Sequence, residues 1–260
     1  MQAPSPPSIF SRRRRIAARA RMARLRQDGN AVSTVAREIA ADAADRLGFL
    51  NRTFDRVLVL GDVTGAFAQE LPGASDVTRA DPSPLLGVPV DEEQPLAGGP
   101  YDLIVSLGLL DTVNDLPGAL VLMRRALAAD GLMIASFLGA GSVPTLRKAM
   151  LAADGDRPAP RIHPQVDVRA AGQLMTRLGF ASPVVDGWSF DVGFESLDQL
   201  VGDLRAQALG NVLADPGPPL GRSSFAAARN AFADEAGDGG LVRERFEIIT
   251  LSGWSPAPRS

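Results

Sequence analysis

The stretch that decides the fold is Val57-Leu58-Val59-Leu60-Gly61-Asp62-Val63-Thr64-Gly65. Four consecutive apolar residues followed by a glycine are typical of a buried parallel strand that runs into a tight turn. In doubly wound α/β sheets, ligands bind at the carboxyl ends of such strands, and a nucleotide-type cofactor needs glycines there because a Cβ atom blocks close approach of the backbone. Gly61 and Gly65 meet this requirement, whereas Val63 fills the position between them. The stretch therefore indicates the fold more strongly than a cofactor-dependent activity.

Around this stretch, strand-like and helix-like segments alternate. The predicted strands are residues 57–60, 76–80, 101–107, 131–138, 183–194 and 243–252. The predicted helices are residues 12–26, 33–49, 64–71, 116–129, 143–153, 167–179, 196–209 and 223–236. Asp115 and Asp167 stand where helix caps are expected, and Gly179 where a helix returns into a strand. This alternation predicts an α/β fold with a parallel sheet covered by helices on both faces.

Composition limits the classes of protein. The chain has 260 residues, of which 45% are hydrophobic, and no apolar run approaches the ~20 residues of a membrane span. It has no cysteine and a single histidine, His163, so no cysteine or multi-histidine metal site is expected. We expect a disordered start and a basic helix in residues 1–30, with Met1 to Ser8 rich in proline and serine. One domain is expected over residues 31–260, with a helical insertion at about 211–240.

Charge is concentrated at the N-terminus. Eight arginines precede the first acid, Asp28, and the rest of the chain is acidic; they are Arg12, Arg13, Arg14, Arg15, Arg19, Arg21, Arg24 and Arg26. A basic helix docked onto its own acidic domain carries as much weight as three alternatives together: a mitochondrial transit peptide, a helix on an anionic membrane and a nucleic-acid arm. No aromatic residue is interleaved after Phe10, so no nucleic-acid partner is expected.

Several short motifs, in a shared order over nearly the whole chain, carry a family resemblance. They are Ile9-Phe10, Asp91-Glu92-Glu93, Val113-Asn114-Asp115-Leu116-Pro117-Gly118, Pro160-Arg161-Ile162, Val166-Asp167-Val168-Arg169, Pro183-Val184-Val185-Asp186 and Leu251-Ser252-Gly253-Trp254. With the glycine turn and the acid after the second strand, the chain resembles class I S-adenosylmethionine (SAM)-dependent methyltransferases. More narrowly, it is similar to the methyltransferase-like assembly factors of respiratory complex I and their alphaproteobacterial relatives. Malonyl-carrier-protein methyltransferases form the sister group.

The resemblance implies a Rossmann-like sheet, SAM as cofactor and a protein client, such as a complex I subunit in which an arginine is hydroxylated. It implies a bacterial cytoplasmic protein, peripheral to the membrane if the arginines bind lipid, or a mitochondrial matrix protein in a eukaryote. It places Asp81 at the SAM ribose and Asp91 or Glu92 on the adenine side, with Gly61, Gly65 and Ser106 as further cofactor-binding candidates. No catalytic residue is assigned.

Each candidate also has a plain structural interpretation. Asp81 before Pro82 is a common turn residue, and Asp91-Glu92-Glu93 could be a solvated loop. Ser106, like Ser136, could be a strand-end serine whose hydroxyl is satisfied by the backbone. Asp115 is expected to cap the helix that follows it.

Five departures from the family pattern point to a weakened site. Val59 replaces the strand acid, Val63 the middle glycine, and Asp62 adds a negative charge near the cofactor's carboxylate. Nine residues, three of them prolines, separate Asp81 from Asp91, too few for a helical crossover to a full third strand. Asp111-Thr112 stands in place of a His-Trp pair. The sequence thus predicts a methyltransferase-family protein with a degenerate cofactor site, acting in complex I assembly, or else a non-catalytic platform for a client protein.

Overall fold

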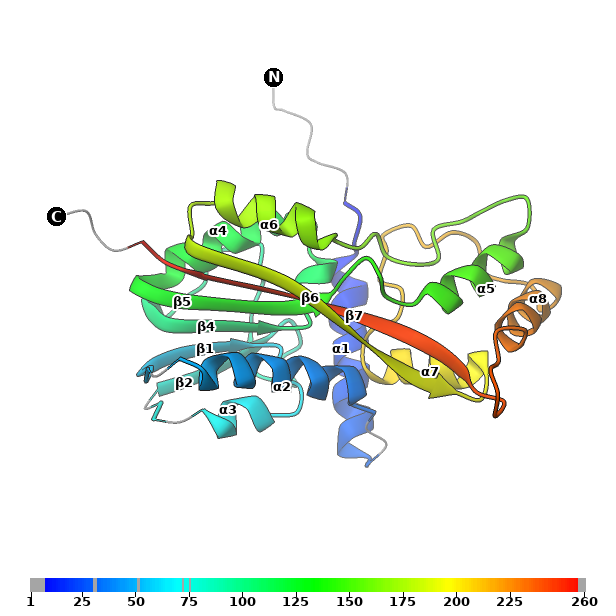
Figure 1. Cartoon of the computed structure of the whole chain (residues 1–260), viewed down its shortest axis with the longest axis horizontal. Coiled ribbons are helices and arrows are strands. Elements are labelled where there is room, and N and C mark those ends of the chain that lie inside the picture. Colours follow the sequence, from blue (N-terminus) through cyan, green and yellow to red (C-terminus); the bar gives the residue numbers. More distant parts are fainter. Residues whose placement is uncertain (1–7, 30–31, 51, 72, 75, 257–260) are drawn as a thin grey trace, which may run out of the picture.

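The computed structural model describes residues 8–29, 32–50, 52–71, 73–74 and 76–256, so the predicted disordered start lies outside the described residues apart from Ser8. These residues build a seven-stranded sheet of order β3-β2-β1-β4-β5-β7-β6 (Figure 1). Its strands are β1 Arg56–Leu60, β2 Asp76–Asp81, β3 Val88–Pro89, β4 Tyr101–Leu107, β5 Leu127–Leu138, β6 Ala181–Phe194 and β7 Val242–Trp254. Strands β1 to β5 are parallel, whereas β7 runs antiparallel to both β5 and β6. The predicted α/β class is confirmed.

Helices cover both faces of the sheet. Helices α2 (Thr34–Gly48) and α3 (Ala66–Glu70) lie on one face, and α4 (Leu116–Ala126) and α6 (Val168–Arg177) on the other (Figure 1). Because side chains of a strand alternate between faces, Val57 and Val59 enter the core under α2, while Leu58 and Leu60 enter the core under α4. All four are buried, which explains the continuous apolar run of the deciding stretch.

The connection after β2 is as short as its length predicts. Residues 82–87 form turns, and β3 consists of only Val88 and Pro89, which pair with Ala80 and Asp81. No helix lies between Asp81 and Asp91, a segment that is described in full. The truncated third strand is therefore confirmed. No helix from this connection covers the carboxyl end of β2.

The boundary between α4 and β5 differs from the prediction. The helix expected over 116–129 ends at Ala126, and the strand expected from Gly131 begins at Leu127. Leu127 pairs with Tyr101 of β4 across an irregularity in the ladder. This long-range pairing outweighs the helical propensity of the alanines that follow, a signal that local sequence does not contain.

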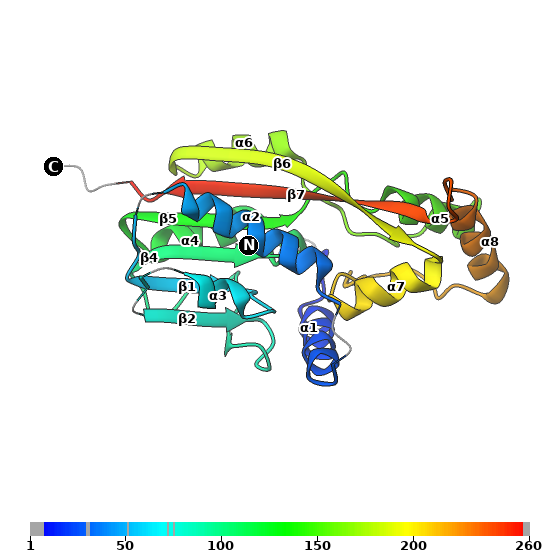
Figure 2. The same ribbon diagram turned by 60° about the horizontal axis from the view of Figure 1, so that its bottom comes forward.

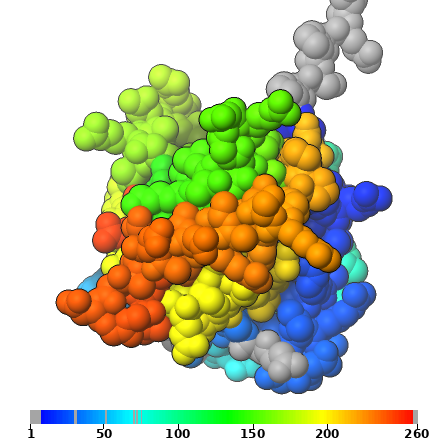
Figure 3. All heavy atoms as spheres, turned by 90° about the vertical axis from the view of Figure 1, so that its right-hand side faces the viewer, coloured from blue at the N-terminus to red at the C-terminus, as the bar shows by residue number. Residues whose placement is uncertain are grey.

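Beyond the sheet, the long strands β6 and β7 carry a second group of helices (Figure 2). This group comprises α5 (Pro144–Asp154), α7 (Leu197–Ala206) and α8 (Arg222–Ala233). Figure 3 shows α8 in orange lying across this end, with α5 in green on one side of it and α7 in yellow on the other. The predicted insertion at about 211–240 contains α8, while α7 precedes it in the same β6–β7 connection. Domain boundaries stay a prediction.

The basic helix α1 (Arg12–Gln27) crosses the carboxyl ends of the parallel strands (Figures 1 and 2). It buries Arg15, Arg19, Met22 and Ala23 against the domain. Of the four interpretations of the basic segment, the docked helix is the arrangement that the structure contains. In the described part of the chain, no helix is both long enough and apolar enough to traverse a bilayer.

Candidate functional site

Asp81, predicted to bind the SAM ribose, forms a buried ion pair with Arg19 of α1. The carboxylate lies at the end of β2 and is 1% exposed. The Arg19 Nε donates to both carboxylate oxygens at 2.9 Å, and Nη2 donates to Oδ2. The Ser83 amide donates to Oδ1 at 2.8 Å, so Asp81 also has the turn role of the plainer interpretation. Every oxygen that could accept a ribose hydroxyl thus already accepts protein hydrogen bonds.

Glu92, predicted for the adenine side, is held in the same way by Arg15. The two guanidinium nitrogens Nη1 and Nη2 donate to Glu92 Oε2 and Oε1 at 3.0 and 2.6 Å. Arg15 also donates to Thr112 Oγ1 at 2.8 Å and to the Leu109 carbonyl at 3.0 Å. Burial alone would lower the pKa of Arg15, but the charge and hydrogen bonds of Glu92 outweigh burial and raise it. The guanidinium therefore stays charged and fully partnered.

The two pairs come from the helical period. Arg15 and Arg19 are four residues apart, so they point to the same face of α1 and reach two neighbouring acids. Sequence analysis named both acids but missed their partners. The signal that could have found them is the spacing of Arg12, Arg15 and Arg19 along one helix face, since Arg12 in turn pairs with Asp91 at 3.0 Å. That pair is more exposed, and Asp91 also accepts from the Glu93 amide within its own turn.

The glycine turn serves the packing of the loop itself. Gly61 has φ +79°, and a Cβ there would lie 2.3 Å from the Leu107 carbonyl oxygen. Gly65 also has positive φ and stands at the start of α3. Asp62 turns into the loop, where Oδ1 accepts from the Gly65 amide at 2.9 Å and Oδ2 from the Ala68 amide at 3.0 Å. Val63 does not have a positive φ, so the loop accommodates its β-branched side chain without left-handed backbone strain.

One interpretation of the serines is wrong. Ser106 is fully buried in β4, but its hydroxyl has no hydrogen-bond partner, backbone or otherwise, among the described residues. The residues paired with it on the neighbouring strands, Leu60 and Ala135, have apolar side chains that offer no acceptor. Ser136 bonds to the Thr250 hydroxyl at 2.9 Å rather than to the backbone. The expected cap at Asp115 is confirmed, with Oδ1 accepting from the Gly118 amide at 2.8 Å.

Motifs that are distant in sequence meet beside these ion pairs. Phe10 and Asn114 exchange two hydrogen bonds, from the Phe10 amide to Oδ1 at 2.8 Å and from Nδ2 to the Phe10 carbonyl at 3.2 Å. The Asp115 amide donates to Glu93 Oε1 at 2.8 Å. Phe10 also forms an antiparallel bridge with Leu213. The resemblance motifs therefore anchor the start of α1 where its arginines reach the acids.

The space around the two acids is too small for a nucleotide-sized cofactor. The cavity that touches Gly61, Asp62 and Arg19 measures about 30 Å³, and its neighbour beside Arg15 and Asp111 about 20 Å³. Ligand pockets for small molecules usually measure about 300 to 1,000 Å³. Asp81 and Glu92 have the right chemistry for SAM, but with α1 in place the residues present do not fit the cofactor. We therefore derive no methyl-transfer step.

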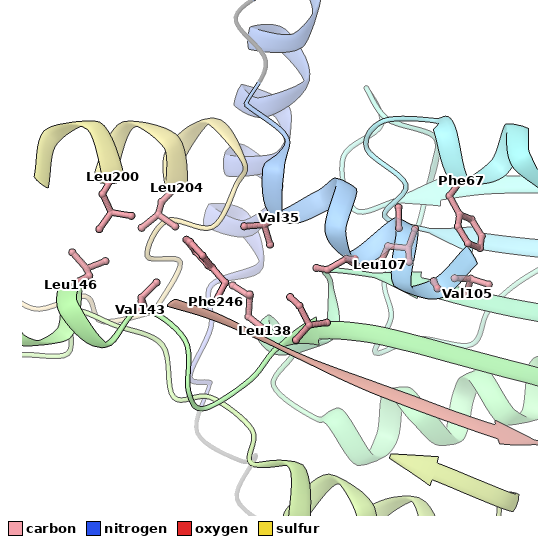
Figure 4. Packing of buried hydrophobic residues seen from close by; sticks show 14 of the residues in the cluster. Val35, Phe67, Val105, Leu107, Leu138, Val143, Leu146, Leu200, Leu204 and Phe246 are labelled. Carbon is pink, nitrogen blue, oxygen red and sulfur yellow. The ribbon is translucent and has the colours of Figure 1, made fainter. Parts of the chain in front are cut away.

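A larger cavity lies farther along the same edge of the sheet. This distal pocket, of about 460 Å³, is enclosed by β5, α5, α7 and the segments 161–165 and 209–220. Figure 4 shows Leu138, Val143, Leu146 and Leu204 converging from these elements. Asp111 lines this pocket and also lines the small cavity beside Arg15. Removal from water raises the pKa of Asp111 to about 6, although the positive charges of Arg15 and Arg19 act to lower it.

His163 faces the same pocket as a neutral side chain. Burial, with the positive charge of Arg14, lowers the pKa of His163 to about 4. Its Nε2 accepts a hydrogen bond from the Val212 amide at 2.8 Å, so the proton is on Nδ1. Within the described chain, no group of three histidine, aspartate or glutamate side chains could hold a metal ion.

The sheet order, the glycine turn at β1 and the acid at the end of β2 define a Rossmann-like protein of the class I methyltransferase type. Comparison with known proteins agrees. A family model described as a methyltransferase domain matches residues 32–182, so the chain belongs to the methyltransferase-domain family. The YcgJ protein of Bacillus subtilis (TM-score 0.55, 11% identity, 83% of this chain and 99% of that one) and BH2331 of Bacillus halodurans (0.52, 13%, 83% and 98%) share the fold.

The chain is also similar in sequence to proteins of two named kinds. The mitochondrial arginine-hydroxylase NDUFAF5 of Danio rerio is 27% identical over 238 residues, which cover 84% of this chain and 74% of that protein. Human NDUFAF5 is 28% identical over 236 residues, 84% and 68% of the two chains. The malonyl-[acyl-carrier protein] O-methyltransferase of Laribacter hongkongensis is 29% identical over 169 residues, 65% of this chain, and the match spans only 56% of that enzyme.

Proposed function

We propose that this chain is a non-catalytic member of the methyltransferase family, in which the N-terminal helix has taken the place of the cofactor and the fold serves as a platform for a client protein. The observation that carries the proposal is the bidentate pairing of Arg19 with Asp81 and of Arg15 with Glu92. The two acids on which SAM would depend are used to dock α1.

The energetics favour the helix over the cofactor. To bind SAM, Asp81 would exchange a charged, bidentate partner for neutral hydroxyls, and charge-assisted hydrogen bonds are the stronger kind. Arg19, which is 6% exposed, would be left buried without its counter-ion unless α1 moved. Binding of SAM therefore requires displacement of α1. That displacement would also expose Met22 and Ala23, which the docked helix buries.

For the client we propose a subunit of respiratory complex I. Support comes from the motifs by which this chain resembles the complex I assembly factors, and from the similarity to Danio rerio NDUFAF5, which covers 84% of this chain. Ile9-Phe10 and the Asn114 motif are among those motifs, and here they fix α1 to the domain.

Isothermal titration of the full chain with SAM tests the cofactor part of the proposal. We expect no saturable heat up to millimolar SAM. The matched control is the variant Arg13→Gln/Arg21→Gln, which removes two charges from the exposed face of α1 and should be equally silent. Micromolar binding by the unaltered chain would overturn the proposal.

A second candidate function is that of a SAM-dependent enzyme that α1 holds closed. The observation in its favour is that both acids, Asp81 and Glu92, are kept although α1 covers them. The variant Arg15→Gln/Arg19→Gln separates the two candidates. Saturable SAM binding by this variant favours the gated enzyme, whereas silence in a folded variant favours the platform.

The client part needs a separate test in cells. Deletion of the gene should lower the amount of assembled complex I, measured on native gels. Complementation with Arg19→Met/Asp81→Leu, which lacks the ribose acid but keeps an apolar contact between α1 and β2, should restore it. A variant that folds and binds α1 but fails to complement would show that Asp81 has a chemical role.

A further inference from the structure

The distal pocket opens beside a second, basic hollow. This basic groove, of about 600 Å³, runs between α1 and the segment 205–212. Its cations are Arg14, Arg21 and Arg205, and small residues, among them Ala17 and Gly210, leave room between them. Arg14 and Arg205 line both hollows, as do Gly210 and Asn211. The two hollows therefore adjoin, one apolar and the other positively charged.

The walls of the distal pocket are mainly hydrocarbon. Besides Leu138, Val143, Leu146 and Leu204, the apolar lining includes Met150, Ile162, Val201, Leu220 and Phe225. The polar groups in the wall are mostly engaged: Asn211 donates to the Arg161 carbonyl at 3.0 Å, and Arg161 forms a pair with Asp154 at 2.7 Å. An apolar chain can therefore enter without stripping hydrogen bonds from these groups.

The cations of the groove remain available. Arg14 uses one nitrogen on the Asn211 carbonyl at 3.1 Å. For the guanidinium groups of Arg21 and Arg205, no hydrogen bond or ion pair with another described residue is found, and both residues are exposed. A guanidinium fork suits carboxylate and phosphate oxygens, which it can bind through two parallel hydrogen bonds.

We propose that this continuous site binds an amphiphilic anion, with its apolar chain in the distal pocket and its carboxylate or phosphate head in the basic groove. The charges also set the orientation. Asp111 lines the distal pocket but not the groove and repels an anionic head, whereas Arg14 and Arg205 line both hollows and attract it. Neither Asp81 nor Glu92 lines this site, but Arg14 and Arg21 belong to α1, so the proposal rests on α1 being docked as in the proposed function.

The test uses the full chain and saturated fatty acids of eight, ten and twelve carbons below their micellar concentrations, measured by titration calorimetry. We expect one saturable site and affinity that rises about fourfold with each methylene that enters the pocket. The neutral alcohol of twelve carbons should bind at least tenfold more weakly than the acid. Equal affinity for acid and alcohol, or no binding of dodecanoate, would overturn the proposal.

Two matched pairs of variants locate the site. Met150→Trp fills the pocket from α5 and should weaken dodecanoate binding at least tenfold, whereas Leu151→Trp, on the next residue and 54% exposed, should not. Arg21→Gln/Arg205→Gln removes the groove's free cations and should weaken it tenfold. Arg13→Gln/Arg222→Gln makes the same change of charge at exposed positions outside both hollows and should leave binding unchanged. If each control weakens binding as much as its partner, the assigned site is wrong.

The anion could be a free fatty acid or the head and chain of a membrane lipid. Sedimentation with phosphatidylglycerol vesicles, compared with phosphatidylcholine vesicles, distinguishes the two sources. Binding to the anionic vesicles that Met150→Trp abolishes assigns the lipid. Anionic-vesicle binding that Met150→Trp leaves intact would indicate a surface charge effect of α1 alone and, with dodecanoate binding also intact, would overturn the proposed site.

Discussion

Two regions at the same edge of the sheet differ in how their space is filled: one by charged side chains, the other by no side chain. Beside Arg15 and Arg19, whose guanidinium groups pair with Glu92 and Asp81, the cavities measure only about 20 and 30 Å³. A short way along the edge, under α5 and α7, about 460 Å³ remain between apolar walls. Buried acids require partners, which the arginines of α1 supply here, whereas an apolar cavity imposes no such requirement.

The largest expected effect concerns the pair that fills the first hollow. Arg19→Met leaves Asp81 buried without a counter-ion and should lower the free energy of unfolding by about 3–5 kcal/mol. Arg19→Met/Asp81→Leu removes both charges and should recover most of that loss. Urea unfolding of the unaltered chain, the two single variants Arg19→Met and Asp81→Leu, and the double variant measures the coupling energy between Arg19 and Asp81.

Arg21→Met is the matched control for that cycle, since Arg21 lies on the exposed face of the same helix. It should change stability by less than ~0.5 kcal/mol. If Arg19→Met were equally mild, α1 would not be held by its ion pairs, and the contrast between the two hollows would lose its basis.

A smaller effect is expected at the glycine turn, whose glycines serve the packing of the loop. Gly61→Ala places a Cβ against the Leu107 carbonyl at positive φ and should cost about 3 kcal/mol. Gly65→Ala also has positive φ, but its nearest neighbour is the flexible Arg79 side chain at 3.4 Å, so about 1 kcal/mol is expected. Thermal unfolding compares the two, and the reverse order would contradict the packing role of Gly61.

Asp111 belongs to both hollows and gives a test by pH. Because its pKa is raised to about 6 in the folded chain, the unfolded carboxyl ionises first, and stability from this group is lost as the pH rises from about 4 to about 6. Asp111→Asn should therefore raise stability at pH 7 by about 2 kcal/mol, and the gain should vanish near pH 4.

The pH dependence of stability expected from His163 has the opposite sign to that from Asp111, so the two contributions can be told apart. Its pKa is lowered to about 4, so its contribution is lost as the pH falls from about 6.5 to about 4. Urea unfolding of the chain, of Asp111→Asn and of His163→Gln at pH 4, 5.5 and 7 resolves both slopes. A gain from Asp111→Asn that does not depend on pH would show that Asp111 is hydrated.

The family resemblance placed the acids of the first hollow, but the sequence did not specify that Arg15 and Arg19 would close it. The apolar run of β1, the cap at Asp115 and the short segment after Asp81 are each encoded within a few residues, and the sequence located them. The Arg15–Glu92 pair spans 77 positions of the chain, and the early start of β5 depends on a ladder with β4. The unpartnered Ser106 hydroxyl likewise depends on which side chains surround it. Such features follow from tertiary contact, which spacing along one chain does not specify.

The smallest effect is expected where opposite charges meet in water rather than in a dry hollow. Lys148 of α5 and Glu235 after α8 lie 3.1 Å apart, but their side chains are 64% and 40% exposed. Solvent screens the attraction, so Lys148→Ala should change the free energy of unfolding by less than about 0.5 kcal/mol. Urea unfolding at low and high salt measures it beside Arg19→Met. A loss above about 2 kcal/mol from Lys148→Ala would mean that the contact of α5 with α8 depends on charge, and the distal pocket's walls would then be held in the same way as the cofactor side.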